Sequence, residues 1–209
     1  MRAGRFAIWA GVAVLVLSSS EAGSATRRFR DVALRWSPTA QLGALAWVDL
    51  AGLGDRTVEL RRFEDQRARR DRIGENREDD PEVYPVATGD DVALWVTGGV
   101  ASTLERVGLR VVERDGDVVV RGAVRHLLLT ERGGFEGEVA LRVIAETLSG
   151  ETLWEGLVVG THSGPGRFDR GRGYSETLSG AVFDAVLRLL QNTEFTEALG
   201  DPRSPDGEE

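Results

Sequence analysis

The fold of this chain is constrained most by residues 109–160, where apolar and charged residues alternate in one short run after another. Successive side chains of a β-strand point to opposite faces, so this alternation predicts strands with one face in the core and one in water. In the longest run, Arg121 and Arg125 mark the face in water. The core-facing positions of that run are Val118, Val120, Val124 and Leu128.

Glycine-containing turns divide this region into four predicted strands. The strands span residues 109–114, 117–130, 135–147 and 152–160. We expect the first two to form a hairpin, because the Asp115-Gly116 dipeptide between them is typical of tight β-turns. Gly133-Gly134 and Ser149-Gly150 provide the later turns.

One further strand and two helices are predicted outside this region. Residues 57–63 alternate as a strand, and residues 90–107 carry apolar side chains at helical spacing, with Gly108 placed to end that helix. Residues 174–192 repeat the helical spacing. The order strand, helix, four strands, helix predicts an α+β fold. Its single, mostly antiparallel sheet carries both helices on one face.

Residues 64–91, between the first strand and the first helix, are crowded with Arg, Asp and Glu. Such a segment buries little apolar surface, so we predict an exposed loop that Asp65 and Arg67 pin by pairing. We favour docking of a protein partner here over calcium binding, because the spacing of a calcium hand is absent and the arginines neutralise the acids. The docking residues that we single out are Asp65, Arg67, Arg69, Asp71 and Arg72.

The amino-terminal residues have the layout of a secretory signal peptide. Arg2 and Arg5 precede an apolar stretch at 6–17, and small residues follow up to Ala25. The apolar stretch is shorter than the roughly 20 residues that a spanning helix needs. We therefore expect a periplasmic protein with no membrane span after cleavage. The predicted parts are a signal peptide (1–25), a lead segment (26–56), an α/β domain (57–199) and a polar, disordered tail (200–209).

The composition excludes several classes of function. The chain has no Cys, which excludes disulfides, thiolate metal sites and lipid attachment through a cysteine. Its net charge of -8 disfavours nucleic acid as a partner. We predict no cofactor and no metal ion.

The two histidines do not form a recognisable catalytic group. His126 falls in the middle of a predicted strand, on the face that we assign to the core, and is interpreted as structural. His162 stands beside Ser163, which raises the hypothesis of a hydrolase. No nucleophile elbow is present and no third catalytic residue can be assigned, so we predict that the protein is not an enzyme.

Several spacings within residues 57–199 resemble those of a known family. The matching residues are Phe63, Asp65, Arg67, Ile73-Gly74, 104–109, Gly150, 154–156, Leu178-Ser179 and Leu189-Leu190. In these spacings the chain resembles the YajG-like family of bacterial envelope lipoproteins, whose relatives include auxiliary components of outer-membrane assembly and transport systems. The resemblance implies a non-enzymatic role and brings no catalytic residues. Family members usually carry a lipid on an N-terminal cysteine, which this chain lacks.

These patterns predict a non-enzymatic periplasmic binding or scaffold protein, accessory to outer-membrane assembly or envelope transport, with an envelope protein as its partner. An alternative is a carrier that holds a lipid or other apolar ligand between sheet and helices. Trp95, Phe183 and Leu187 would line the cavity of such a carrier. The oligomeric state stays open.

Overall fold

The structure is a computed structural model that describes residues 32–38, 53, 55–79, 81–165 and 170–200. The predicted signal peptide, most of the predicted lead segment and tail residues 201–209 lie outside the described residues. The described elements are β1 (Thr57–Leu60), β2 (Glu64–Asp65), β3 (Gly74–Asn76), β4 (Tyr84–Val86), α1 (Val92–Arg106), β5 (Arg110–Val112), β6 (Val118–Glu131), β7 (Gly134–Glu146), β8 (Thr152–Pro165), α2 (Arg170–Leu190) and α3 (Thr193–Gly200).

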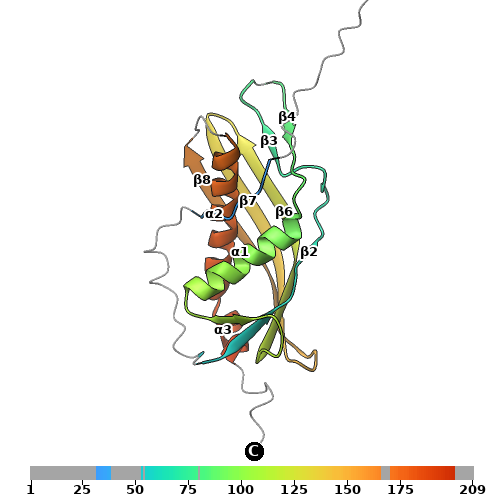
Figure 1. Cartoon of the computed structure of the whole chain (residues 1–209), viewed down its shortest axis with the longest axis vertical. Coiled ribbons are helices and arrows are strands. Elements are labelled where there is room, and N and C mark those ends of the chain that lie inside the picture. Colours follow the sequence, from blue (N-terminus) through green and yellow to red (C-terminus); the bar gives the residue numbers. More distant parts are fainter. Residues whose placement is uncertain (1–31, 39–52, 54, 80, 166–169, 201–209) are drawn as a thin grey trace, which may run out of the picture.

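The described strands form one mixed sheet (Figure 1). Strand β6 is its centre, because β1, β2 and β3 pair with it in parallel and β7 pairs with it antiparallel. Strand β5 adds to β1 in parallel, whereas β4 adds to β3 and β8 adds to β7 antiparallel. The long antiparallel strands β6, β7 and β8 therefore make one part of the sheet, and short strands make the other.

The expected fold class, a single mostly antiparallel sheet with two helices, is wrong. Four of the seven strand pairings are parallel, and the described residues include a third helix, α3. The segment predicted as an exposed loop, 64–91, supplies β2, β3 and β4 and buries Ile73 and Val86. These strands are two or three residues long, and backbone hydrogen bonds to neighbouring strands hold them, so their side chains carry little pattern.

The expected hairpin between the first two strands of the 109–160 region is also wrong. Strand β1 lies between β5 and β6 and is parallel to both. The connection from β5 to β6 passes close over β1, since a Cβ on Gly116 would lie 2.4 Å from the backbone nitrogen of Glu59. Asp117 completes the crossing by accepting a hydrogen bond of 2.6 Å from the backbone N–H of Thr57. The Asp115-Gly116 dipeptide thus marks a crossing over a third strand.

Strand β6 exchanges its two faces at a β-bulge. The pairing with β7 shifts between Val124 and His126, which leaves Arg125 as an extra residue. Because side chains alternate with a period of two, one extra residue moves every later side chain to the opposite face. Leu127, 4% exposed, therefore lies in the core, and the assignment of Leu128 and His126 to the core face is wrong.

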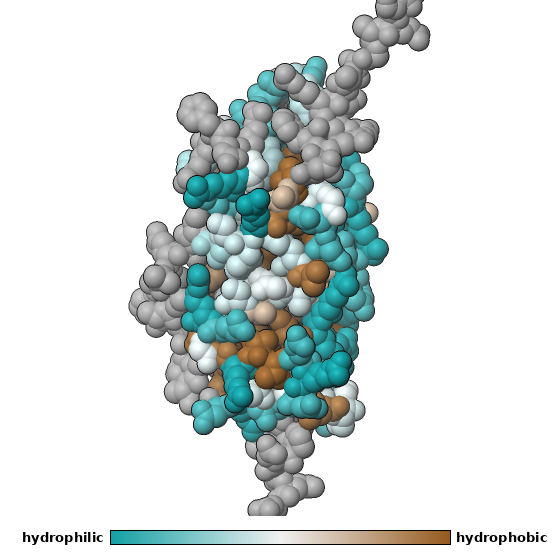
Figure 2. All heavy atoms as spheres, in the orientation of Figure 1, coloured by the Kyte–Doolittle hydropathy of each residue, from teal (hydrophilic) through white to brown (hydrophobic). Residues whose placement is uncertain are grey.

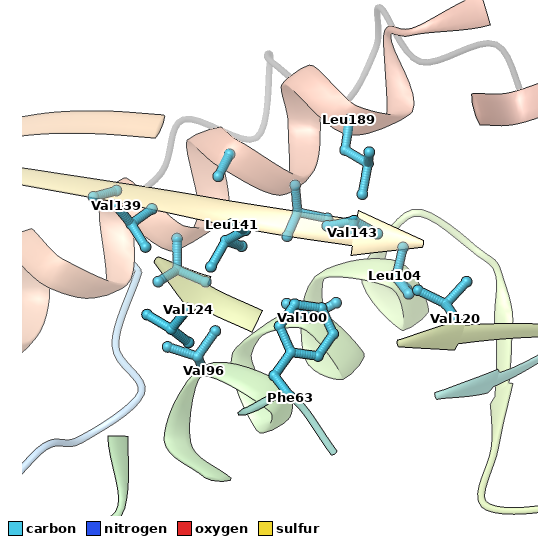
Figure 3. Packing of buried hydrophobic residues seen from close by; sticks show 14 of the residues in the cluster. Phe63, Val96, Val100, Leu104, Val120, Val124, Val139, Leu141, Val143 and Leu189 are labelled. Carbon is cyan, nitrogen blue, oxygen red and sulfur yellow. The ribbon is translucent and has the colours of Figure 1, made fainter. Parts of the chain in front are cut away.

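Helices α1 and α2 both lie on one face of the sheet, as Figure 1 shows. Gly108, with φ at +98°, follows the end of α1 as the sequence predicts. Side chains from α1, α2, β6 and β7 meet in one apolar core (Figure 3). The labelled core residues are Phe63, Val96, Val100, Leu104, Val120, Val124, Val139, Leu141, Val143 and Leu189.

Helix α2 rests directly on the sheet. A Cβ on Gly160 of β8 would lie 2.2 Å from the carbonyl oxygen of Ala181, and one on Gly137 of β7 would lie 3.0 Å from Thr177. This contact leaves no room for a ligand where α2 crosses these two glycines. The helix-bearing face otherwise shows apolar patches bordered by hydrophilic residues (Figure 2). None of the described helices is both long enough and apolar enough to cross a membrane.

Candidate functional site

The predicted docking loop begins with an ion pair that is largely withdrawn from water. Arg67 donates from Nε to Asp65 Oδ1 and from Nη2 to Asp65 Oδ2, both at 2.9 Å, while Nη1 donates to the carbonyl oxygen of Arg72 at 2.9 Å. The Arg67 side chain is 4% exposed. These bonds lower the pKa of Asp65, although its partial burial works in the other direction. Arg67 is therefore a rigid part of the loop.

Arg72 lies at the other end of the same turn, and its contacts with acids are longer and therefore weaker. Its Nη1 lies 3.5 Å from Glu75 Oε1 and its Nη2 lies 3.5 Å from Asp71 Oδ2. Its Nε is buried and has no hydrogen-bond partner among the described residues. Such a donor is expected to attract an acceptor, because a buried N–H without a partner is unfavourable.

Two residues of β6 complete the site. Arg125, the bulge residue, donates to Gln66 Oε1 at 2.6 Å, and the next residue, His126, lies with Nε2 3.6 Å from Glu138 Oε1. Together with the loop they line a cavity of about 360 Å³, which we call the arginine pocket. Its lining residues are Arg67, Ala68, Arg69, Arg72, Glu75, Arg125, His126, Leu127 and Leu128.

The charge of the arginine pocket is strongly unbalanced. Among the residues that the structure describes, four arginines and a histidine line it, and Glu75 is the one acid in its wall. Asp65 compensates Arg67 from outside the pocket, whereas Arg69 is exposed and makes no ion pair within the described residues. Guanidinium groups bind carboxylates and phosphates through paired hydrogen bonds. The pocket is therefore suited to an anionic group, and the half-buried Leu128 supplies an apolar part of its wall.

Not every predicted docking residue faces this pocket. Arg67, Arg69 and Arg72 line it, but Asp65 lines a neighbouring cavity of about 600 Å³ beside the start of α1, and the Asp71 side chain is 69% exposed. No group of three or more metal-ligating side chains occurs in the part of the chain that the structure describes. The loop acids Asp65, Asp71 and Glu75 instead pair with arginines.

The sequence interpretation missed Arg125 and His126 as site residues. It placed Arg125 on a plain solvent face and His126 in the core, because the bulge that turns both toward the loop leaves no mark in the alternation of apolar residues. The composition of the loop gives no signal of an anion site either, because ten acids stand against five arginines in residues 64–91.

His162 and Ser163 are not arranged as a catalytic pair. Both belong to β8, where successive side chains point to opposite faces. His162 packs over Gly180 of α2, whose added Cβ would lie 2.3 Å from the imidazole ring. The geometry therefore does not direct this imidazole at the neighbouring hydroxyl.

Comparisons with known proteins give a fold but no family. No family model and no curated protein matches the chain. Protein XCC0632 from Xanthomonas campestris, a member of the family DUF330, aligns with a TM-score of 0.50 and 13% identity over 81% of this chain and 95% of its own. This likeness shows a shared fold. The YajG-like resemblance stays a prediction.

Two other solved structures align less well. A "putative lipoprotein" from Caulobacter crescentus has a TM-score of 0.44 and 11% identity over 75% of this chain and 99% of its own. The PelC dodecamer from Paraburkholderia phytofirmans has a TM-score of 0.40 and 16% identity over 66% of this chain and 87% of its own.

Proposed function

We propose that this chain is a non-enzymatic binding or scaffold protein of the bacterial envelope, accessory to outer-membrane assembly or transport, that holds an acidic segment of a protein partner in the arginine pocket. The observation that carries the proposal is the convergence of Arg69, Arg72 and Arg125 on one cavity, with a single acid among the described residues of its wall. The envelope location is supported by the predicted signal peptide.

The pocket suits a protein partner for two reasons. Arg67 is fixed by Asp65, so one wall is ordered before a ligand arrives and loses little entropy on binding. Arg69 extends into solvent and attracts acidic groups from a distance, which raises the rate of encounter. An acidic side chain next to an apolar one would satisfy both the guanidinium groups and Leu128.

The carrier alternative has weaker support. Phe183 and Leu187 are 3% and 6% exposed and pack in the protein, and α2 lies in direct contact with β8 at Gly160. A bound lipid would have to separate this helix from the sheet.

The test is photo-cross-linking in intact cells. A cross-linking amino acid at Ala68, in the pocket wall, is compared with one at Leu157, which is 65% exposed on β8. We expect an envelope protein to be captured from position 68 only. The Arg69→Glu and Arg125→Glu double variant should reduce this capture by about tenfold or more, as loss of roughly 1.4 kcal/mol of binding free energy implies.

The matched control reverses the charge of Arg110, an exposed arginine of β5 outside the pocket. Arg110→Glu should leave the capture unchanged. Equal capture from all three forms of the protein would contradict the proposal, and so would capture from position 157 alone.

A further inference from the structure

Residues 32–38 form an extended segment that pairs with none of the described strands (Figure 1, blue trace beside α2). Its backbone is bonded on both sides. The N–H of Val32 donates to the carbonyl oxygen of Ala87 at 3.1 Å, and that of Leu34 donates to Asp90 Oδ2 at 2.6 Å. The segment therefore lies between the loop that precedes α1 and the surface of α2.

On the α2 side, two serine hydroxyls make the backbone hydrogen bonds that a neighbouring strand would otherwise make. Ser175 Oγ accepts from the N–H of Arg35 at 3.2 Å and donates to the carbonyl of Ala33 at 3.0 Å. Ser179 Oγ accepts from the N–H of Ser37 at 3.0 Å and donates to the carbonyl of Arg35 at 3.3 Å. The serines are one helical turn apart and recognise main-chain atoms, so the contact does not depend on side-chain identity.

One side chain supplies an anchor. Trp36 lies on Gly99 of α1, where a Cβ would come within 2.4 Å of its ring, and it meets Trp95 edge to face with ring centroids 5.9 Å apart. Gly98, the preceding residue, has nothing within 4 Å of an added Cβ. Of these two glycines, only Gly99 provides the space that the Trp36 ring occupies, on the face of α1 beside Trp95.

The docked segment packs against the core through the partly buried side chains of Val32, Leu34 and Trp36 but does not enter it. None of its residues is buried, whereas Ser175 and Ser179 beneath it are 3% and 0% exposed. A segment held at the surface by partly buried side chains and local hydrogen bonds can open without unfolding the rest of the domain. A cavity of about 530 Å³ continues beside it, between Arg35 and Arg172, so the groove has more space than the segment fills.

We propose that the groove between α1 and α2 is a binding site for an extended peptide with an aromatic side chain, which residues 32–38 fill as a detachable strap. A partner protein with such a segment displaces the strap, bonds its backbone to Ser175 and Ser179 and seats its aromatic ring on Gly99. This site is separate from the arginine pocket and does not depend on its function.

The first test measures hydrogen exchange in the full chain. The amides of Arg35 and Ser37 should exchange at least about 100-fold faster than those of the β6–β7 ladder, and their rates should not change in mild denaturant. Gly99→Ala should remove their protection, because the new methyl group displaces Trp36, and Gly98→Ala should not. Exchange of these amides only with global unfolding would overturn the proposal.

The second test titrates a labelled, end-capped peptide of residues 32–38 into the full chain carrying Trp36→Ala. It should bind at least about tenfold more tightly than to the wild-type chain, in which the strap competes for the groove. Adding Gly99→Ala should abolish binding, and adding Gly98→Ala should not. A folded Trp36→Ala chain that fails to bind the peptide rejects the site; if this variant does not fold, hydrogen exchange decides.

Discussion

Arg67 and Asp65 form a bidentate ion pair across a two-residue step, with two hydrogen bonds of 2.9 Å between guanidinium and carboxylate. The third guanidinium nitrogen reaches the carbonyl oxygen of Arg72, so one side chain ties both ends of the turn together. This tie holds Arg69 and Arg72 on the same side of β6 as Arg125. The shape of the arginine pocket therefore depends on a residue that faces away from it, Asp65.

Asp65→Asn should lower the free energy of unfolding by about 1–3 kcal/mol at pH 7, because it leaves a buried guanidinium with weaker partners. Urea denaturation of both proteins measures the difference. Asp71→Asn is the matched control, since the Asp71 side chain is 69% exposed and its contact with Arg72 is 3.5 Å long. Its effect should stay below about 0.5 kcal/mol.

The stabilisation from Asp65 should depend on pH in one direction. The pKa of Asp65 is lowered in the folded protein from its ordinary value of 3.8. The unfolded chain therefore binds the proton first, and the stabilisation is complete above that value and is lost as the pH falls through the folded pKa. The difference between wild type and Asp65→Asn should shrink below pH 3.8. A constant difference from pH 7 to pH 3 would contradict this assignment.

Tyr174→Phe should cost about 1–3 kcal/mol of stability, because it removes one donor from a buried carboxylate. The Tyr174 hydroxyl and the Asn76 amide both donate to Glu131 Oε2, so this carboxylate joins α2 to β3 and β6. Tyr84→Phe is the control, since its hydroxyl donates to Glu82 at an exposed site. Thermal unfolding of the two variants should differ clearly; equal melting temperatures would contradict a structural role for the Glu131 cluster.

The sequence predicts those parts of the fold in which a side-chain pattern repeats several times. Helix α1, predicted at 90–107, is observed at 92–106, and the long strands lie where alternation places them. The pattern does not reveal which strands are neighbours. Parallel insertion of β1 between β5 and β6 is fixed by backbone pairing and by the crossing at Gly116, and neither is recorded in hydrophobicity.

Only the part of the candidate site that lies within the loop could be predicted from the sequence. Charge density identified the loop and its arginines, because these residues are close together along the chain. Arg125 and His126 lie about 55 residues away and reach the pocket through a bulge at one position of β6. The sequence analysis placed the strap in a lead segment outside the domain for the same reason. Its partners Ser175 and Ser179 are more than 100 residues away in the sequence, where they look like ordinary small helix residues.

Gly160→Ala and Gly98→Ala should have opposite effects on stability. The first places a methyl group 2.2 Å from the backbone of α2, so helix and sheet must separate, and overpacking of this kind costs about 1–3 kcal/mol. The second adds a methyl group in open space within α1 and should stabilise the helix by up to about 1 kcal/mol. Chemical denaturation tests both; a stabilised Gly160→Ala protein would mean that α2 does not rest on β8.

Leu127→Ala and Leu128→Ala test the bulge in β6 directly. With unbroken alternation from Val124, the even-numbered Leu128 would lie in the core and Leu127 in water. With Arg125 as an extra residue the order reverses, and Leu127 is 4% exposed in the core while Leu128 lies half-buried at the arginine pocket. Leu127→Ala should therefore cost about 2–5 kcal/mol and Leu128→Ala clearly less. If Leu128→Ala proved the more damaging in urea denaturation, the bulge, and with it the placement of Arg125 and His126 at the pocket, would be wrong.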